Sequence, residues 1–226
     1  MKYSVKLNIS LLCCSLLVSA ACSGSSPTNG TDIAPANPAT TGAVTSGANP
    51  REELDRAIKA QLNARSFRMR LVPAHGSGGG ARVTIESEYV NPDRSRFRMG
   101  TMETVMIGGD IYMKMPGAAW TKSGDTSDPD EASQFSNQVL ADTLKHLRDV
   151  TFVGTDALEG SPMRVYRYVF DDPNAGRTTS KIWIEASNDL PRKVESETKV
   201  AGEPKKMEVV MTFYDYNANI KIEPPM

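Results

Sequence analysis

Hydrophobic and polar residues alternate with a period of two along most of the chain after residue 65. Phe67, Met69 and Leu71, for example, are separated by Arg68 and Arg70. This alternation is typical of antiparallel strands with one buried face and one solvated face. Turn-forming stretches separate the alternating segments, so the pattern predicts about ten strands. The residues predicted to share the apolar face are Phe67, Met69, Leu71, Val83, Ile85, Phe97, Met99, Met113, Met115, Ile182, Ile184, Met207, Val209, Met211 and Phe213.

Two segments have a helical spacing instead. The first begins at Asn49 and Pro50, which suit an N-cap and a first helical position, and we expect it to end near Ala64. The second begins in the same way at Asp128 and Pro129 and is expected to reach residue 148. Each helix has one apolar stripe. The stripes consist of Leu54, Ala57, Ile58 and Leu62 in the first helix and Phe135, Val139, Leu140, Leu144 and Leu147 in the second.

The order of these elements predicts an α+β domain over residues 49–226. It reads as one helix, about five strands, a second helix and about five more strands. A single antiparallel sheet of about 10–11 strands curls rather than lying flat. The apolar face of the curl needs cover, and two amphipathic helices are available to pack on its concave side. A cavity can remain between the helices and the sheet.

Residues 1–21 have the three-part layout of a secretory signal, with a basic start, an apolar run and small residues at the end. The apolar run is shorter than the roughly 20 residues that a membrane-spanning helix needs. The five residues ending at Cys22 resemble the lipobox of bacterial lipoproteins, although Ser19 stands where leucine is usual. We therefore expect cleavage after Ala21 and lipidation of Cys22. An ordinary signal peptide cleaved near Ala21 is the alternative.

Residues 22–48 are rich in small and polar residues, with Asp32 as the single charge. They predict a disordered linker, which would have a root-mean-square span of about 25–30 Å. All three cysteines lie at or before Cys22, so the domain beyond has no disulfide and no thiolate site. After cleavage 24 basic and 27 acidic residues remain. This balance gives no basis for nucleic-acid binding.

Three short motifs follow the predicted strands. Residues 89–98 turn through a proline into an Arg-Phe-Arg strand, residues 107–114 form a glycine-turn hairpin followed by Trp120, and residues 213–225 end in an Ile-Glu-Pro tail. With the anchor, the tether and the leading helix, they resemble the bacterial lipoprotein-carrier superfamily, which includes LolA, LolB and the LppX/LprG lipoproteins. The resemblance implies an unclosed β-barrel whose helices form a lid over an apolar cavity that holds acyl chains. The fifteen apolar-face residues above would then line this cavity.

Two compositional features leave alternatives open. Methionines are frequent on the predicted strands, where a flexible thioether suits an adaptable ligand surface, but ordinary core filling explains them as well. Arginines gather on the polar face of the early strands, where they either form a patch for lipid headgroups or an acidic partner, or pair with Glu86 and Glu88. The pattern favours pairing. These arginines are Arg68, Arg70, Arg82, Arg94, Arg96 and Arg98.

No catalytic constellation is evident in the sequence. His75 and His146 have no partner at metal-ligand spacing, and the run from Gly76 to Gly80 lacks the Gly-Lys-Ser/Thr of a phosphate loop. No pair of carboxylates is set apart for acid–base work. We therefore expect no enzymatic activity, no metal and no cofactor.

The predicted function is that of a membrane-anchored, monomeric lipoprotein of the bacterial cell envelope. It would bind a lipid or an acylated protein in an apolar cavity, in lipid or lipoprotein transport or localisation. The alternative is an envelope sensor or protein-interaction module that uses the same fold without a transported ligand. Ser23, rather than aspartate, follows Cys22. This favours the periplasmic side of the outer membrane in a Gram-negative source, and the outer face of the cytoplasmic membrane otherwise.

Overall fold

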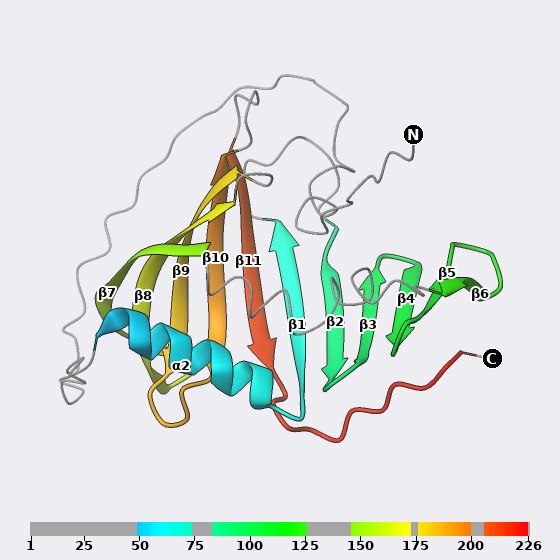
Figure 1. Cartoon of the computed structure of the whole chain (residues 1–226), viewed down its shortest axis with the longest axis horizontal. Coiled ribbons are helices and arrows are strands. Elements are labelled where there is room, and N and C mark those ends of the chain that lie inside the picture. Colours follow the sequence, from blue (N-terminus) through cyan, green and yellow to red (C-terminus); the bar gives the residue numbers. More distant parts are fainter. Residues whose placement is uncertain (1–48, 74–82, 126–145, 173–175, 200–205, 226) are drawn as a thin grey trace, which may run out of the picture.

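A computed structural model describes residues 49–73, 83–125, 146–172, 176–199 and 206–225 (Figure 1). The described residues form eleven strands and one helix, α2 (Pro50–Asn63). The strands are β1 (Ser66–Pro73), β2 (Ile85–Val90), β3 (Arg94–Met99), β4 (Met102–Ile107), β5 (Asp110–Lys114), β6 (Thr121–Asp125), β7 (Leu147–Leu158), β8 (Ser161–Asp172), β9 (Gly176–Glu185), β10 (Pro191–Lys199) and β11 (Lys206–Tyr214). No helix in these ranges is long and apolar enough to cross a membrane.

All eleven strands belong to one antiparallel sheet. Their order is β6-β5-β4-β3-β2-β1-β11-β10-β9-β8-β7, so β6 and β7 are the two edges and the sheet is unclosed. Two runs of consecutive hairpins are joined at one place, where β1 pairs with β11. The predicted large antiparallel sheet of about 10–11 strands is confirmed. The chain therefore leaves the sheet at one edge and re-enters it at the other.

The register separates two faces, because directly paired residues point to the same side. We call the side on which α2 packs the helix face and the opposite side the outer face. Thirteen of the fifteen residues predicted to share an apolar face lie on the helix face, as the strand pairings show. Val83 precedes β2, and Met115 follows β5 and is exposed. For those two positions the strand assignment was wrong.

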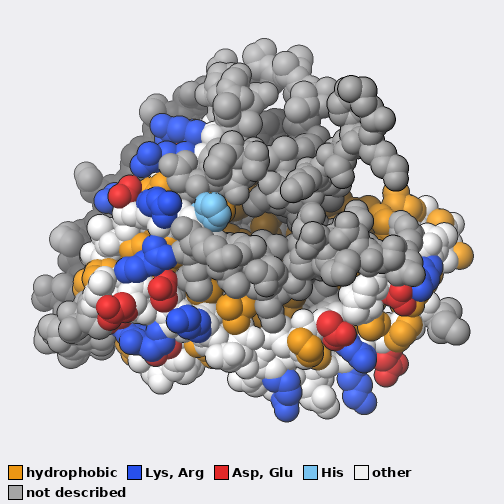
Figure 2. Space-filling model, viewed as in Figure 1, with side chains coloured by type: hydrophobic (Ala, Val, Ile, Leu, Met, Phe, Trp, Pro, Cys, Tyr) orange, Lys and Arg blue, Asp and Glu red, His pale blue; other side chains and the backbone are white. Residues whose placement is uncertain are grey.

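The local sequence accounts for α2. The Asn49 side chain accepts a hydrogen bond from the Arg51 amide at 3.0 Å, Pro50 occupies the first turn, and the helix ends at Asn63 as predicted. Figure 1 shows α2 lying across one end of β7–β11, and Figure 2 shows basic and acidic side chains intermixed over this part of the surface. The buried apolar residues of the helix are Leu54, Ala57 and Ile58.

The second predicted helix lies mostly outside the described residues. Its expected end is wrong, because Leu147 and Arg148 begin β7 and pair with Phe170 and Val169 of β8. Leu147 fits the helical stripe and the strand equally well, so local spacing could not decide between them. In the structure its side chain is fully buried in the core beneath α2, and its carbonyl accepts a hydrogen bond from the Arg51 guanidinium at 2.9 Å. Among the described residues, α2 is the one helix found on the helix face.

The outer face is less polar than the alternation predicted. One apolar cluster consists of Val105, Ile220 and Ile222, and another of Met163, Val165 and Trp183. The first exists because the C-terminal segment runs along this face without forming a strand. The Ser66 hydroxyl donates to the Ala218 carbonyl at 2.6 Å, and Arg94 donates to the Ile222 carbonyl at 2.8 Å.

Candidate functional site

One row of apolar side chains crosses eight neighbouring strands on the helix face. Each member lies directly opposite the next one in the sheet. From β8 to β4 the row is Tyr166, Ile182, Val194, Met211, Leu71, Ile85, Met99 and Met102. No charged residue interrupts it. The sheet therefore offers a continuous apolar strip across most of its width.

Burial divides this row into two parts. Tyr166, Ile182 and Val194 are fully buried and pack in the core beneath α2. From Met211 to Met102 the row is only partly buried. We call these five residues, Met211, Leu71, Ile85, Met99 and Met102, the open row. Partly buried neighbours on the same face extend it, namely Met69, Phe97, Met113, Met207 and Val209.

The predicted cavity residues thus fall into two sets. Phe67, Ile182, Ile184 and Phe213 are buried, and all four pack in the core beneath α2. The others on the helix face belong to the open row or to its surroundings. Methionines dominate this second set, and methionine adapts its shape to irregular apolar partners. The partly buried region is therefore the better candidate for a ligand surface.

Several hydroxyl side chains lie on the helix face, between the apolar row and the β10–β11 connection. Ser180 and Ser196 share a hydrogen bond of 2.8 Å, and Thr178 and Thr198 share one of 2.9 Å. Burial raises the pKa of the Tyr168 phenol, and a hydrogen bond with Ser180 opposes that shift. The hydroxyls satisfy one another in pairs, so this part of the face is polar without being charged.

The arginines on the outer face form ion pairs with cross-strand acids. Arg68 and Arg96 both contact Glu88, at 2.9 and 3.0 Å, and Arg70 contacts Glu86 at 2.9 Å. The pairing that the sequence favoured is confirmed for these residues. Asp215 and Glu88 raise the pKa of Arg68 through hydrogen bonds.

Two further arginines of the predicted set are also engaged. Arg98 lies 3.4 Å from Glu103, and Arg94 donates to the C-terminal segment. Arg82 lies outside the described residues. Since the acids of the same face neutralise most of these guanidinium groups, this surface is a self-paired ladder and not a free cationic patch.

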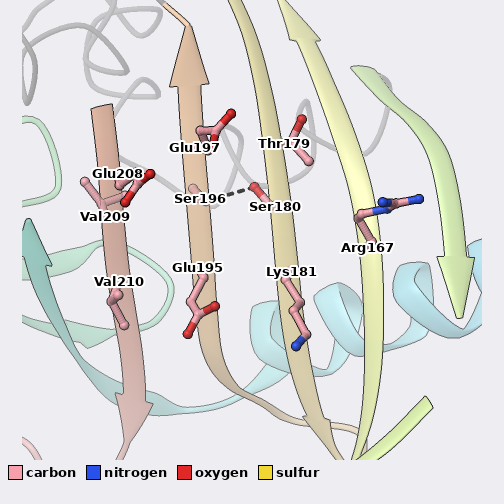
Figure 3. A pocket seen from close by; sticks show the side chains of 10 residues that line it. All are labelled: Arg167, Thr179, Ser180, Lys181, Glu195, Ser196, Glu197, Glu208, Val209 and Val210. Carbon is pink, nitrogen blue, oxygen red and sulfur yellow. Dashed lines mark hydrogen bonds between the residues drawn. The ribbon is translucent and has the colours of Figure 1, made fainter. Parts of the chain in front are cut away.

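A shallow hollow of about 350 Å³ lies on the outer face of β8–β11 (Figure 3). Five of its ten lining residues are charged: Arg167, Lys181, Glu195, Glu197 and Glu208. Lysine ammonium groups lie 2.7 Å from Glu195 and 2.8 Å from Glu197. The predicted apolar cavity is a different place, since its residues point to the opposite face, and only Val209 is common to both sets.

A buried ion network holds α2 against the sheet. Arg164 of β8 lies 3.7 Å from Glu53 of α2 and also contacts Asp189 in the β9–β10 turn. Asp189 in turn accepts from Arg56 of α2 at 2.8 Å. Arg164 and Glu53 are only 8% and 4% exposed. The sequence interpretation missed this network, although Glu53 lies beside the apolar stripe of α2, where a charge would be unexpected.

Sites for catalysis or metal binding are not evident in the described ranges. No group of three or more histidine, cysteine, aspartate or glutamate residues there could hold a metal ion. His146 packs edge-on against Phe170, with 5.9 Å between the ring centroids. His75 and Cys22 lie outside the described residues.

Comparison with known proteins supports the fold alone. No family model and no curated protein matches the chain. Among solved structures, LprF from Mycobacterium bovis matches with a TM-score of 0.54 and 14% identity, over 78% of this chain and 96% of that one. The Mycobacterium tuberculosis lipoprotein LppX matches with a TM-score of 0.53 and 11% identity, over 77% and 98%. The chain therefore shares the fold of LprF and LppX, which is the fold that the sequence motifs predicted.

Proposed function

We propose that this chain is a non-enzymatic lipoprotein of the bacterial cell envelope that binds a lipid, or the acyl chains of another lipoprotein, on its helix face. The observation that carries the proposal is the open row. Its five residues lie on five adjacent strands, which gives a length of about 19 Å at the usual strand spacing. One leaflet of a bilayer is about 15 Å of hydrocarbon, so an acyl chain fits along the row.

The chemistry of the surface agrees with such a ligand. An acyl chain has no hydrogen-bonding groups, and the open row presents only aliphatic and thioether side chains. Each methylene group removed from water contributes about 0.8 kcal/mol. The ligand would then lie in a cavity lined by the partly buried residues of the helix face.

The remaining parts of the proposal concern the N-terminal segment. Cleavage after Ala21 would leave Cys22 as the lipidated first residue, and residues 22–48 would tether the domain to the membrane. A fixed anchor suits a protein that receives, presents or senses a ligand, because a carrier that shuttles between membranes must dissociate. This arrangement would place the protein in the cell envelope, and the charge balance of the chain gives no basis for nucleic-acid binding.

Mass spectrometry of the purified mature chain tests the proposal. We expect organic extraction to release phospholipid or another acylated molecule in a near-stoichiometric amount. A chain that carries no lipid, and takes up none after incubation with envelope lipids, would contradict it. If the chain instead captures one protein partner, and substitutions in the open row leave that capture unchanged, the sensor or interaction module is the better description.

A further inference from the structure

An uncharged turn projects from the sheet between β5 and β6. Residues 115–119 are all exposed, and Met115 is 51% exposed, one of two large hydrophobic residues in the described ranges with such accessibility. The turn reads Met-Pro-Gly-Ala-Ala and contains no charge. Its apolar side chains have no role in the open row or in any core cluster of the described residues.

The turn is held in one conformation. The Ala118 amide donates to the Met115 carbonyl at 3.0 Å, with Pro116 and Gly117 at the two central positions and a φ of +73° at Gly117. This is the arrangement of a type II turn, for which proline and glycine are the preferred residues. The next residue, Trp120, packs against the outer-face cluster that includes Val105 and Ile222. A partner that contacts this turn would therefore pay little ordering entropy.

Lysines and a tryptophan surround the uncharged tip. Lys114 is exposed, with its ammonium group 5.9 Å from the centre of the Trp120 ring. Lys122 is about half exposed and contacts Asp110 at 2.7 Å. Tryptophan and lysine beside exposed apolar residues are typical of segments at a membrane–water interface, where the ring lies at headgroup level and the ammonium groups approach lipid phosphates.

The position of the turn fits such a contact. β5 and β6 form the end of the sheet opposite α2 and β7, and Figure 2 shows hydrophobic side chains gathered at that end. The open row ends on β4, the strand next to β5. A membrane contact at this turn would therefore bring one end of the open row toward the bilayer.

We propose that the turn at residues 115–119 is a second membrane contact, which enters the headgroup region of a phospholipid bilayer and orients the sheet. The proposal rests on the envelope location of the proposed function, but not on the identity of its ligand. A tip of only five residues binds weakly alone, so it acts together with the anchor, which raises its effective concentration at the surface.

Tryptophan quenching by brominated phospholipids tests the contact. Cys22 is the only cysteine after residue 21, so a chain expressed without residues 1–21 keeps its thiol free and can be coupled through it to a maleimide phospholipid in vesicles. Trp183→Phe leaves Trp120 as the single reporter. We expect brominated vesicles to reduce Trp120 emission at least about twofold relative to unbrominated ones, because an interfacial tryptophan lies within reach of the bromine atoms.

Two substitutions in this background supply the comparison. Met115→Asp should abolish most of the quenching. Val153→Asp is the matched control, because Val153 is 53% exposed on β7, at the other edge of the sheet. This variant should be quenched as strongly as the parent. Absence of quenching in the parent protein, or equal quenching in both variants, would overturn the proposal. An emission change that depends on protein concentration and not on bromine would indicate contact with a second copy and would also overturn it.

The result of the quenching experiment does not depend on whether the proposed function is correct. Cell fractionation of the Cys22→Ala variant reports on natural anchoring, and extraction of the purified chain reports on the ligand. The quenching experiment uses a chemical anchor, so it gives a result whichever way those two measurements turn out.

Discussion

Leu71 of β1 lies directly opposite Met211 of β11, and this pair joins the two halves of the apolar row. On one side of the pair the row continues through Val194 into the core beneath α2, and on the other it continues through Ile85 toward β4. The residues of the pair are separated by 140 positions in the chain, so the open row exists only because the last strand returns to the first. The β1–β11 pairing therefore creates the candidate ligand surface.

The ion network beneath α2 should contribute strongly to stability. Arg164→Ala removes a buried charge and leaves the buried Glu53 carboxylate unpaired, while Asp189 keeps Arg56, so the substitution should cost about 3 kcal/mol of unfolding free energy. Urea unfolding at neutral pH measures this. Arg167→Ala is the control, because Arg167 is exposed on the same strand, and its loss should cost less than about 0.5 kcal/mol. Equal effects of the two substitutions would show that the network is not important for stability.

The C-terminal segment should stabilise the outer-face cluster. Ile222 is 2% exposed, so Ile222→Ala should lower the unfolding free energy by about 2–4 kcal/mol. Because Trp120 packs in the same cluster, its emission should shift to longer wavelength in this variant. Lys221→Ala, at the neighbouring exposed position, should change neither quantity. An unshifted spectrum with unchanged stability would mean that the segment does not hold the cluster together.

The hydrogen bond between Trp183 and Asp156 gives a prediction about pH. The Trp183 indole donates to the Asp156 carboxylate at 2.9 Å. This hydrogen bond is the main reason why the pKa of the Asp156 carboxyl group lies below its ordinary value of 3.8 in the folded protein. The pKa of Asp156 is lower in the folded protein than in the unfolded chain. The contribution of the Asp156 carboxylate to stability is therefore complete above the unfolded pKa, and it is lost as the pH falls through the folded pKa.

The difference in unfolding free energy between the parent and Asp156→Asn should therefore become smaller as the pH falls through the folded pKa of Asp156. In the Trp183→Phe background, Asp156→Asn should cost less at neutral pH, because the indole donor is gone. Unfolding free energies of the four proteins at neutral and strongly acidic pH form a double-mutant cycle that measures this. A coupling that does not change with pH would contradict the assignment of the shift to Trp183.

The features that depend on local periodicity, namely the two faces of the strands and the position of α2, could be predicted from the sequence. Alternation placed Phe67, Met69 and Leu71 on one face, and the capping residues located α2. It failed where one residue satisfies two periods, as Leu147 does in a helical stripe that is in fact the start of a strand. Strand order, and so the continuity of the open row, depends on contacts between distant residues that no local pattern contains.

The outer-face features were missed for a related reason. Val105 and Trp183 occupy positions that the alternation assigns to solvent, yet both are buried, because the C-terminal segment covers the first and lysine side chains lie over the second. The Arg164–Glu53 pair joins β8 to α2 across more than a hundred residues. Only Glu53, a charge beside an apolar stripe, could have indicated it in advance.

Ligand affinity in two matched double variants tests the central proposal most directly. Leu71→Gln with Met99→Gln places two amides in the open row, whereas Arg70→Gln with Arg98→Gln changes the adjacent positions of the same two strands on the outer face. After removal of bound lipid, each protein is titrated with a fluorescent fatty acid, and thermal unfolding confirms that both are folded. The row variant should bind at least about tenfold more weakly than the parent, since burying amides beside an acyl chain costs more than about 1.4 kcal/mol, and the outer-face variant should bind normally. Equal affinity in all three proteins would show that the open row is not the ligand surface.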